Sequence, residues 1–142
     1  MIDVRSAPYA ALILRLTLGA LFLVHAGLKI LVFTPAGTAQ FFGSLGLPPV
    51  LAYLTMAAEI LGGLCLILGL FTRFAALALV VVLVGAIATV HGANGFFFTN
   101  TGGGWEYPGF WAITLLVQAL LGDGAFALRS PSQKGLELAL AR

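Results

Sequence analysis

Three ionisable residues interrupt apolar stretches of the sequence and could carry proton chemistry there. His25 and Lys29 lie in the first stretch and Glu59 lies in the second. Lys29 follows His25 by four residues, so the two side chains share one face of a helix. Burial and a nearby cation shift the pKa of a carboxyl group in opposite directions, so a group of this kind could exchange protons near neutral pH. We therefore take Glu59, His25 and Lys29 as candidate catalytic residues.

A structural role is the alternative for the same residues. Glu59 could pair with Lys29 or with Arg15 and thereby fix how two helices pack. Buried ion pairs perturb pKa values without any catalysis, so the sequence does not decide between the two roles.

Five further residues are candidates for ligand binding: His91, Trp105, Glu106, Tyr107 and Arg15. The structural alternatives are an interfacial aromatic belt for Trp105, Tyr107 and the nearby Trp111, and a favourable acid at a helix N-terminus for Glu106. No metal site is expected, because the sequence has no HExxH spacing. The predicted depths of the two histidines differ by about 10 Å, which argues against a haem between them.

The elements that must position these residues are four apolar stretches, at about 11–32, 50–70, 74–91 and 107–124. Hydrophobic residues make up 61% of the chain and charged residues only 8%, too few to solvate a soluble domain. The pattern predicts an all-α integral membrane four-helix bundle, up-down-up-down, in a single domain over 1–142 with a short cytoplasmic tail at 125–142. The connection at 33–49 is predicted to be an interfacial loop.

The basic residues predict the orientation in the membrane. With both termini cytoplasmic, all but Lys29 fall on the cytoplasmic side: Arg5, Arg15, Arg73, Arg129, Lys134 and Arg142. This is the positive-inside pattern of a multi-pass protein, which we place in a bacterial inner membrane. The basic residues are scattered singly, so no nucleic-acid partner is expected.

Small residues predict that the first two spans are neighbours. Gly19 lies in the first span, and Gly62 and Gly63 lie in the second, where they allow close helix contact. Antiparallel packing of these spans would bring Glu59, His25 and Lys29 into one outward-facing cavity. Cys65 is the single cysteine, so no disulfide can form within the chain.

Three ordered motifs across residues 12–124 resemble the DoxX family. They are Arg15-Leu16-x-x-Gly19-x-x-Phe22 with Gly27-Leu28-Lys29, Glu59-x-x-Gly62-Gly63 with Gly69-Leu70-x-Thr72-Arg73, and Gly103-Gly104-Trp105-Glu106-Tyr107-Pro108. The resemblance implies a four-helix bacterial membrane protein. Relatives in that family include the small subunit of a thiosulfate:quinone oxidoreductase and a membrane partner in a thiol-oxidative-stress complex.

Three functions follow as hypotheses. The first is a membrane subunit of a redox system that binds a quinone-like ligand in the outward-facing cavity. Because the sequence has no cysteine pair, flavin fingerprint or evident haem site, redox activity would need a partner subunit, and no covalent cofactor is expected. The second is a non-catalytic scaffold that anchors partner proteins in the bilayer. The third is a small transporter that works as a homo-oligomer.

Overall fold

The computed structural model describes residues 3–128, and all regular structure within this range is helical. The elements in chain order are α1 (Ala7–Gly27), η1 (Leu28–Val32), α2 (Pro35–Ser44), α3 (Val50–Leu68), α4 (Thr72–Ala86), η2 (Ile87–His91), η3 (Gly92–Asn94) and α5 (Glu106–Leu121). The π-helical segment η1 continues α1. The π-helical segment η2 and the short 3₁₀ turn η3 continue α4.

Three helical stretches of the described chain are long and apolar enough to cross a membrane: Ala7–Val32, Val50–Leu68 and Thr72–Asn94. They match the first three predicted spans. The fourth prediction, 107–124, corresponds to α5, which has 16 residues. At 1.5 Å per residue it is about 24 Å long, shorter than a hydrocarbon core of ~30 Å. Most of the predicted tail lies outside the described residues, as do three of the basic residues behind the predicted orientation.

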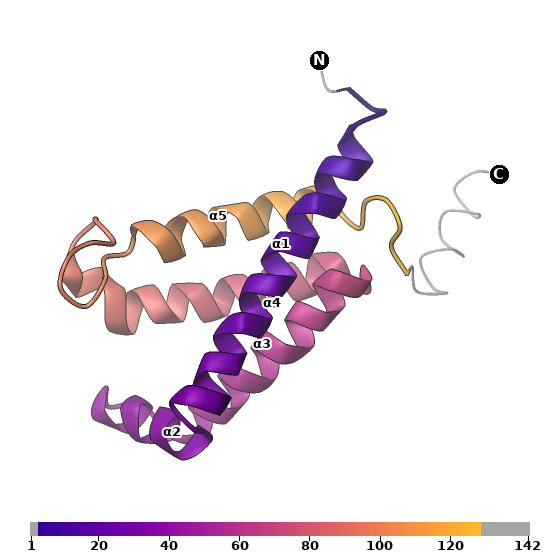
Figure 1. Cartoon of the computed structure of the whole chain (residues 1–142). Helices are drawn as coiled ribbons and strands as arrows, with labels where there is room; N and C mark the ends of the chain where they lie inside the picture. Colours follow the sequence, from indigo (N-terminus) through magenta and orange to yellow (C-terminus); the bar gives the residue numbers. More distant parts are fainter. Residues whose placement is uncertain (1–2, 129–142) are drawn as a thin grey trace.

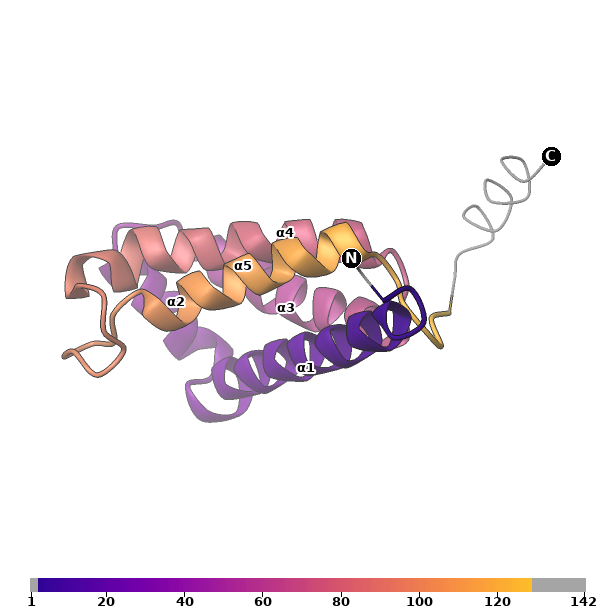
Figure 2. The same cartoon turned by 90° about the horizontal axis from the view of Figure 1, so that it is seen from above.

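The long helices pack in two pairs. α1 lies against α3, α4 lies against α5, and contacts between α3 and α4 join the pairs (Figures 1 and 2). The buried apolar core draws on all four helices, with Leu18, Phe22, Leu66, Ala76, Leu79, Leu83, Trp111, Ala112 and Leu115. Which side of a membrane each end of the molecule faces stays a prediction.

Glycines let α1 and α3 approach closely, as the sequence predicted for the first two spans. A Cβ atom added at Gly19 would lie 2.7 Å from the carbonyl oxygen of Gly63 and 2.7 Å from Cγ1 of Ile67. The two backbones are therefore in contact at this crossing, the geometry that small residues permit between membrane helices.

We expect Gly19→Ala to lower the free energy of unfolding by about 1–3 kcal/mol, because the new methyl group overpacks the crossing. Gly27→Ala is the matched control in the same helix, since a Cβ there would meet no atom within 4 Å. Thermal unfolding of the detergent-solubilised protein measures both changes. Equal stability of the two variants would show that the crossing tolerates a methyl group.

The connection between the first two spans contains a helix where the sequence predicted a loop. Proline occupies the first turn of α2, where its missing N–H costs nothing, and the side chain of Thr34 accepts a hydrogen bond from the Gly37 backbone N–H at 3.1 Å. The buried hydroxyl of Thr38 lies 2.9 Å from the Thr34 carbonyl oxygen and 3.1 Å from that of Lys29. These contacts fix α2 against the end of the first span.

Candidate functional site

A buried ion pair joins the first and second spans. Nζ of Lys29 lies 2.8 Å from Oε1 and 2.9 Å from Oε2 of Glu59. The Glu59 side chain is 5% exposed and that of Lys29 is 21% exposed. The pairing partner of Glu59 is therefore Lys29, and Arg15 lies elsewhere.

The ion pair lies on the wall of a cavity of about 660 Å³, which we call the central cavity. The ionisable side chains and the tryptophan of its lining come from α1, η1, α3, η2 and α5: His25, Lys29, Glu59, His91, Tyr107 and Trp111. Most of the remaining lining residues are apolar and come from α2, α3, α4 and the loops that follow α2 and η3. The structure thus brings together all three candidate catalytic residues and two of the candidate ligand-binding residues.

Trp111 is a lining residue that the sequence did not single out, because an interfacial belt explained it equally well. Trp111 is 5% exposed, and its ring packs against that of Phe22 at 4.4 Å between centroids. The ring of His25 meets it edge-on at 5.0 Å, and that of Tyr107 lies 5.7 Å away. The partly buried His25 is therefore held beside the ion pair by an aromatic contact.

Both π-helical segments carry residues of the central cavity. Lys29 lies in η1 and His91 ends η2. A π-helical turn within an α-helix is rare and occurs frequently at functional sites, because the widened turn changes the direction of its side chains. The i, i+4 argument from sequence assumed a regular helix and could not reveal these turns.

The glycine-rich loop that precedes α5 is held over one end of the central cavity. Nδ1 of His91 lies 2.8 Å from the carbonyl oxygen of Gly103, and Nδ2 of Asn94 donates to the same oxygen at 3.1 Å. Three successive loop carbonyls, of residues 95–97, accept hydrogen bonds from the backbone N–H groups of residues 104–106. A side chain at Gly104 would collide with these carbonyl oxygens, so the loop requires glycine there.

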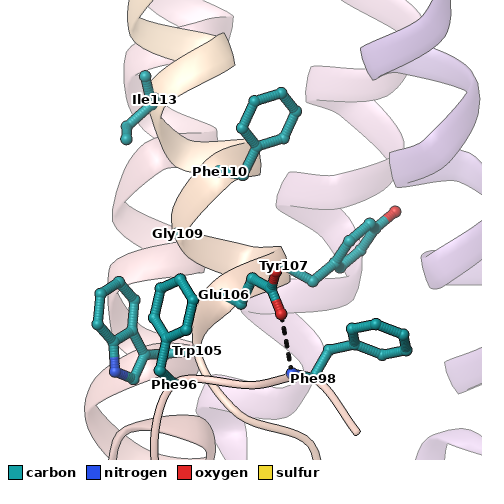
Figure 3. Close-up of a pocket in the computed structure, with 8 residues that line it drawn as sticks. All are labelled: Phe96, Phe98, Trp105, Glu106, Tyr107, Gly109, Phe110 and Ile113. Atoms are coloured by element: carbon teal, nitrogen blue, oxygen red, sulfur yellow. Dashed lines mark hydrogen bonds between the residues drawn. The ribbon is translucent and has the colours of Figure 1, made fainter.

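Trp105 and Glu106 lie at a second hollow of about 470 Å³, the aromatic cleft, outside the central cavity (Figure 3). Oε2 of Glu106 accepts a hydrogen bond from the Phe98 backbone N–H at 3.1 Å. The carboxylate therefore ties the loop to the first turn of α5. Tyr107 lines both hollows.

Arg15 lies at the opposite end of the molecule from the ion pair. It is 1% exposed, and its guanidinium donates to the carbonyl oxygens of Leu66, Ile67 and Ala125. It lines neither the central cavity nor the aromatic cleft. Its contacts join the end of α3 to the segment that follows α5.

The chain is similar to one protein family and to two proteins over most of their length. The DoxX family model matches residues 10–92. A Bacillus subtilis protein named "Putative oxidoreductase CatD" is 36% identical over 124 residues, which cover 87% of this chain and 87% of that protein. An uncharacterized Haemophilus influenzae protein is 35% identical over 123 residues, which cover 85% of this chain and 89% of that protein. No solved structure gave a significant match. The chain belongs to the DoxX family.

Proposed function

We propose that this protein is an integral membrane subunit of a redox system and binds a quinone-like ligand in the central cavity. The observation that carries the proposal is the Lys29–Glu59 ion pair on the wall of a mostly apolar cavity of about 660 Å³. Ligand sites are typically apolar hollows with a few polar groups that orient the ligand. A quinone ring with two carbonyl oxygens suits such a lining.

The lining residues have the chemistry that a quinone requires. Reduction of a quinone to a quinol consumes two electrons and two protons. The Lys29 ammonium would donate a hydrogen bond to one ring carbonyl, and Glu59 and His25 would exchange protons with the ring oxygens. Trp111 and Tyr107 would contact the ring faces. With one cysteine in the chain, the electrons would come from a redox-active partner subunit.

The membrane arrangement belongs to the same proposal. We place four helices across a bacterial inner membrane with both termini cytoplasmic, α5 being the shortest. Arg15 and Arg73 lie towards the end where α3 is joined to α4, and Lys29 lies at the other end with the ion pair. The positive-inside pattern supports a central cavity that faces away from the cytoplasm.

Quinone binding to the purified, detergent-solubilised protein tests this function. We expect saturable binding by the wild type, and Glu59→Gln and His25→Ala each to weaken it at least about tenfold, equivalent to ~1.4 kcal/mol. Glu106→Gln is the matched control, because its carboxylate lies outside the central cavity. A fluorescence or calorimetric titration gives the dissociation constants.

Folding of each variant is verified by its thermal transition before binding is compared. If the folded wild type shows no saturable binding, the redox proposal fails and the non-catalytic scaffold becomes the better account. If Glu59→Gln and Glu106→Gln both bound the quinone as tightly as the wild type, the ligand would lie outside the central cavity.

A further inference from the structure

Exposed residues of the cavity lining lie on α4 with η2 and, facing them, on α2 with the start of α3, and we take the space between these two rims as a mouth of the central cavity. Val81, Gly85 and Thr89 line the first rim at spacings of four, so they share one helical face. Phe41 and Leu51 line the second rim. All five residues are exposed, and Val81 is 70% exposed.

This mouth lies at the depth of the bilayer. Val81 and Gly85 fall near the middle of Thr72–Asn94, a stretch long and apolar enough to cross a membrane. The one hydroxyl among these five rim residues is satisfied internally, because Oγ1 of Thr89 donates to the Gly85 carbonyl oxygen at 2.8 Å. A surface with its polar groups satisfied is what contact with lipid requires.

Polarity changes from the mouth to the interior of the cavity. The rim residues are uncharged, whereas the ion pair and both histidines lie further along the lining, on η1, α1, α3 and the end of η2. An amphiphile that enters head first would place its polar head against Lys29 and Glu59 and leave its hydrocarbon tail in the mouth.

We propose that the ligand of the central cavity is a membrane-dissolved amphiphile that enters sideways from the bilayer, with its tail between α2 and α4. This inference rests on the proposed function, because it takes the quinone-like head as given. It adds the substrate class, a tailed molecule delivered by the lipid phase. It also assigns Gly85 as the residue that keeps the mouth open.

Gly85 suits this assignment because its missing side chain leaves empty space. A Cβ atom added there would meet no heavy atom within 4 Å. A side chain at this position would therefore begin in open space, and we expect a phenylalanine there to occupy the mouth. Gly43 of α2 provides a matched control, since its Cβ would also meet no atom within 4 Å and it does not line the cavity.

The first test compares a tailless benzoquinone with its decyl-tailed analogue in lipid nanodiscs. Each dissociation constant is expressed as a mole fraction of the ligand in the lipid phase, so that partitioning into the bilayer does not affect the comparison. We expect the wild type to bind both compounds. Gly85→Phe should weaken binding of the decyl compound at least about tenfold more than binding of the tailless one, a change of ~1.4 kcal/mol. Gly43→Phe should leave both affinities unchanged.

Two results of this test would overturn the lateral mouth while leaving the proposed function intact. One is rejection of the decyl compound by a wild type that binds the tailless quinone, which would indicate a closed cavity. The other is equal affinity of the wild type and Gly85→Phe for the decyl compound. Failure of the wild type to bind either compound would instead count against the proposed function.

A second test probes the mouth without any quinone. In a Trp105→Phe background Trp111 is the single tryptophan, and it lies in the cavity wall. Phospholipids with brominated acyl chains quench tryptophan fluorescence on close approach. We expect Gly85→Phe, but not Gly43→Phe, to reduce this quenching relative to the parent. Identical quenching in all three proteins would show that lipid chains do not enter the mouth.

Discussion

Replacing Lys29 by methionine is expected to lower the free energy of unfolding by about 3–5 kcal/mol, because it leaves a buried carboxylate without its counter-ion. Glu59 is 5% exposed and receives both of its hydrogen bonds from the ammonium group of Lys29. A glutamate side chain is too short to carry its charge from this position to water. The carboxyl group must therefore stay charged inside the protein or take up a proton at neutral pH, and either state costs free energy.

The reverse substitution is expected to cost less. In Glu59→Leu the remaining charge belongs to Lys29, which is 21% exposed and has a long flexible stem. Such a side chain can extend until its ammonium group reaches a more polar environment. The two single variants should therefore differ in stability, with Lys29→Met the less stable.

A double-mutant cycle measures the pair directly. Replacing a buried ion pair with apolar residues of similar volume is often neutral or stabilising, so we expect Lys29→Met/Glu59→Leu to fall within about 1 kcal/mol of the wild type. Thermal or denaturant unfolding in detergent gives the four stabilities. Simple addition of the two single effects in the double variant would show that the groups do not interact.

The stability cycle and the binding assay together separate the two roles that the sequence left open. A purely structural pair predicts that the double variant, with its stability restored, also behaves as the wild type in quinone binding. A ligand-binding pair predicts restored stability without restored binding. Quinone binding by the double variant therefore distinguishes a structural role of Lys29 and Glu59 from a role in ligand binding.

The sequence predicted much of the central cavity for identifiable reasons. Lys29 and His25 are four residues apart, so a regular α-helix would place them on one face. The glycines of the first two spans predicted that these spans are in contact, and antiparallel packing of the two spans then placed Glu59 beside His25 and Lys29. Each step used local periodicity or the length of an apolar stretch, which a sequence displays directly.

Other features depend on tertiary contacts that a sequence does not display. The π-helical turns at Lys29 and His91 change the register by one residue, and no residue type requires them. Trp111 looked like a belt residue until its packing against Phe22 and His25 showed it on the cavity wall. Arg15 was a candidate ligand-binding residue and a position of the first family motif. Its partners are backbone carbonyls more than fifty residues away.

Arg15→Met is expected to destabilise the protein by about 3 kcal/mol or more, since hydrogen bonds to charged groups contribute ~1.5–3 kcal/mol each. The last carbonyl groups of a helix lack partners within the helix, and Arg15 supplies donors for those of Leu66 and Ile67. Its positive charge also lies at the negative end of the α3 dipole. Its third bond, to Ala125 at 3.0 Å, holds the segment after α5 against this end.

Two further variants define the cause of that loss. Arg15→Lys should recover only part of the stability, because an ammonium group cannot reproduce the planar fork that reaches three carbonyls. Arg5→Met is the control for removal of a positive charge, since Arg5 is exposed, and it should change stability little. If Arg15→Met instead abolished quinone binding with stability unchanged, Arg15 would be a ligand-binding residue after all. The carbonyl contacts lead us to expect the opposite result: loss of stability with the quinone affinity of the remaining folded protein unchanged.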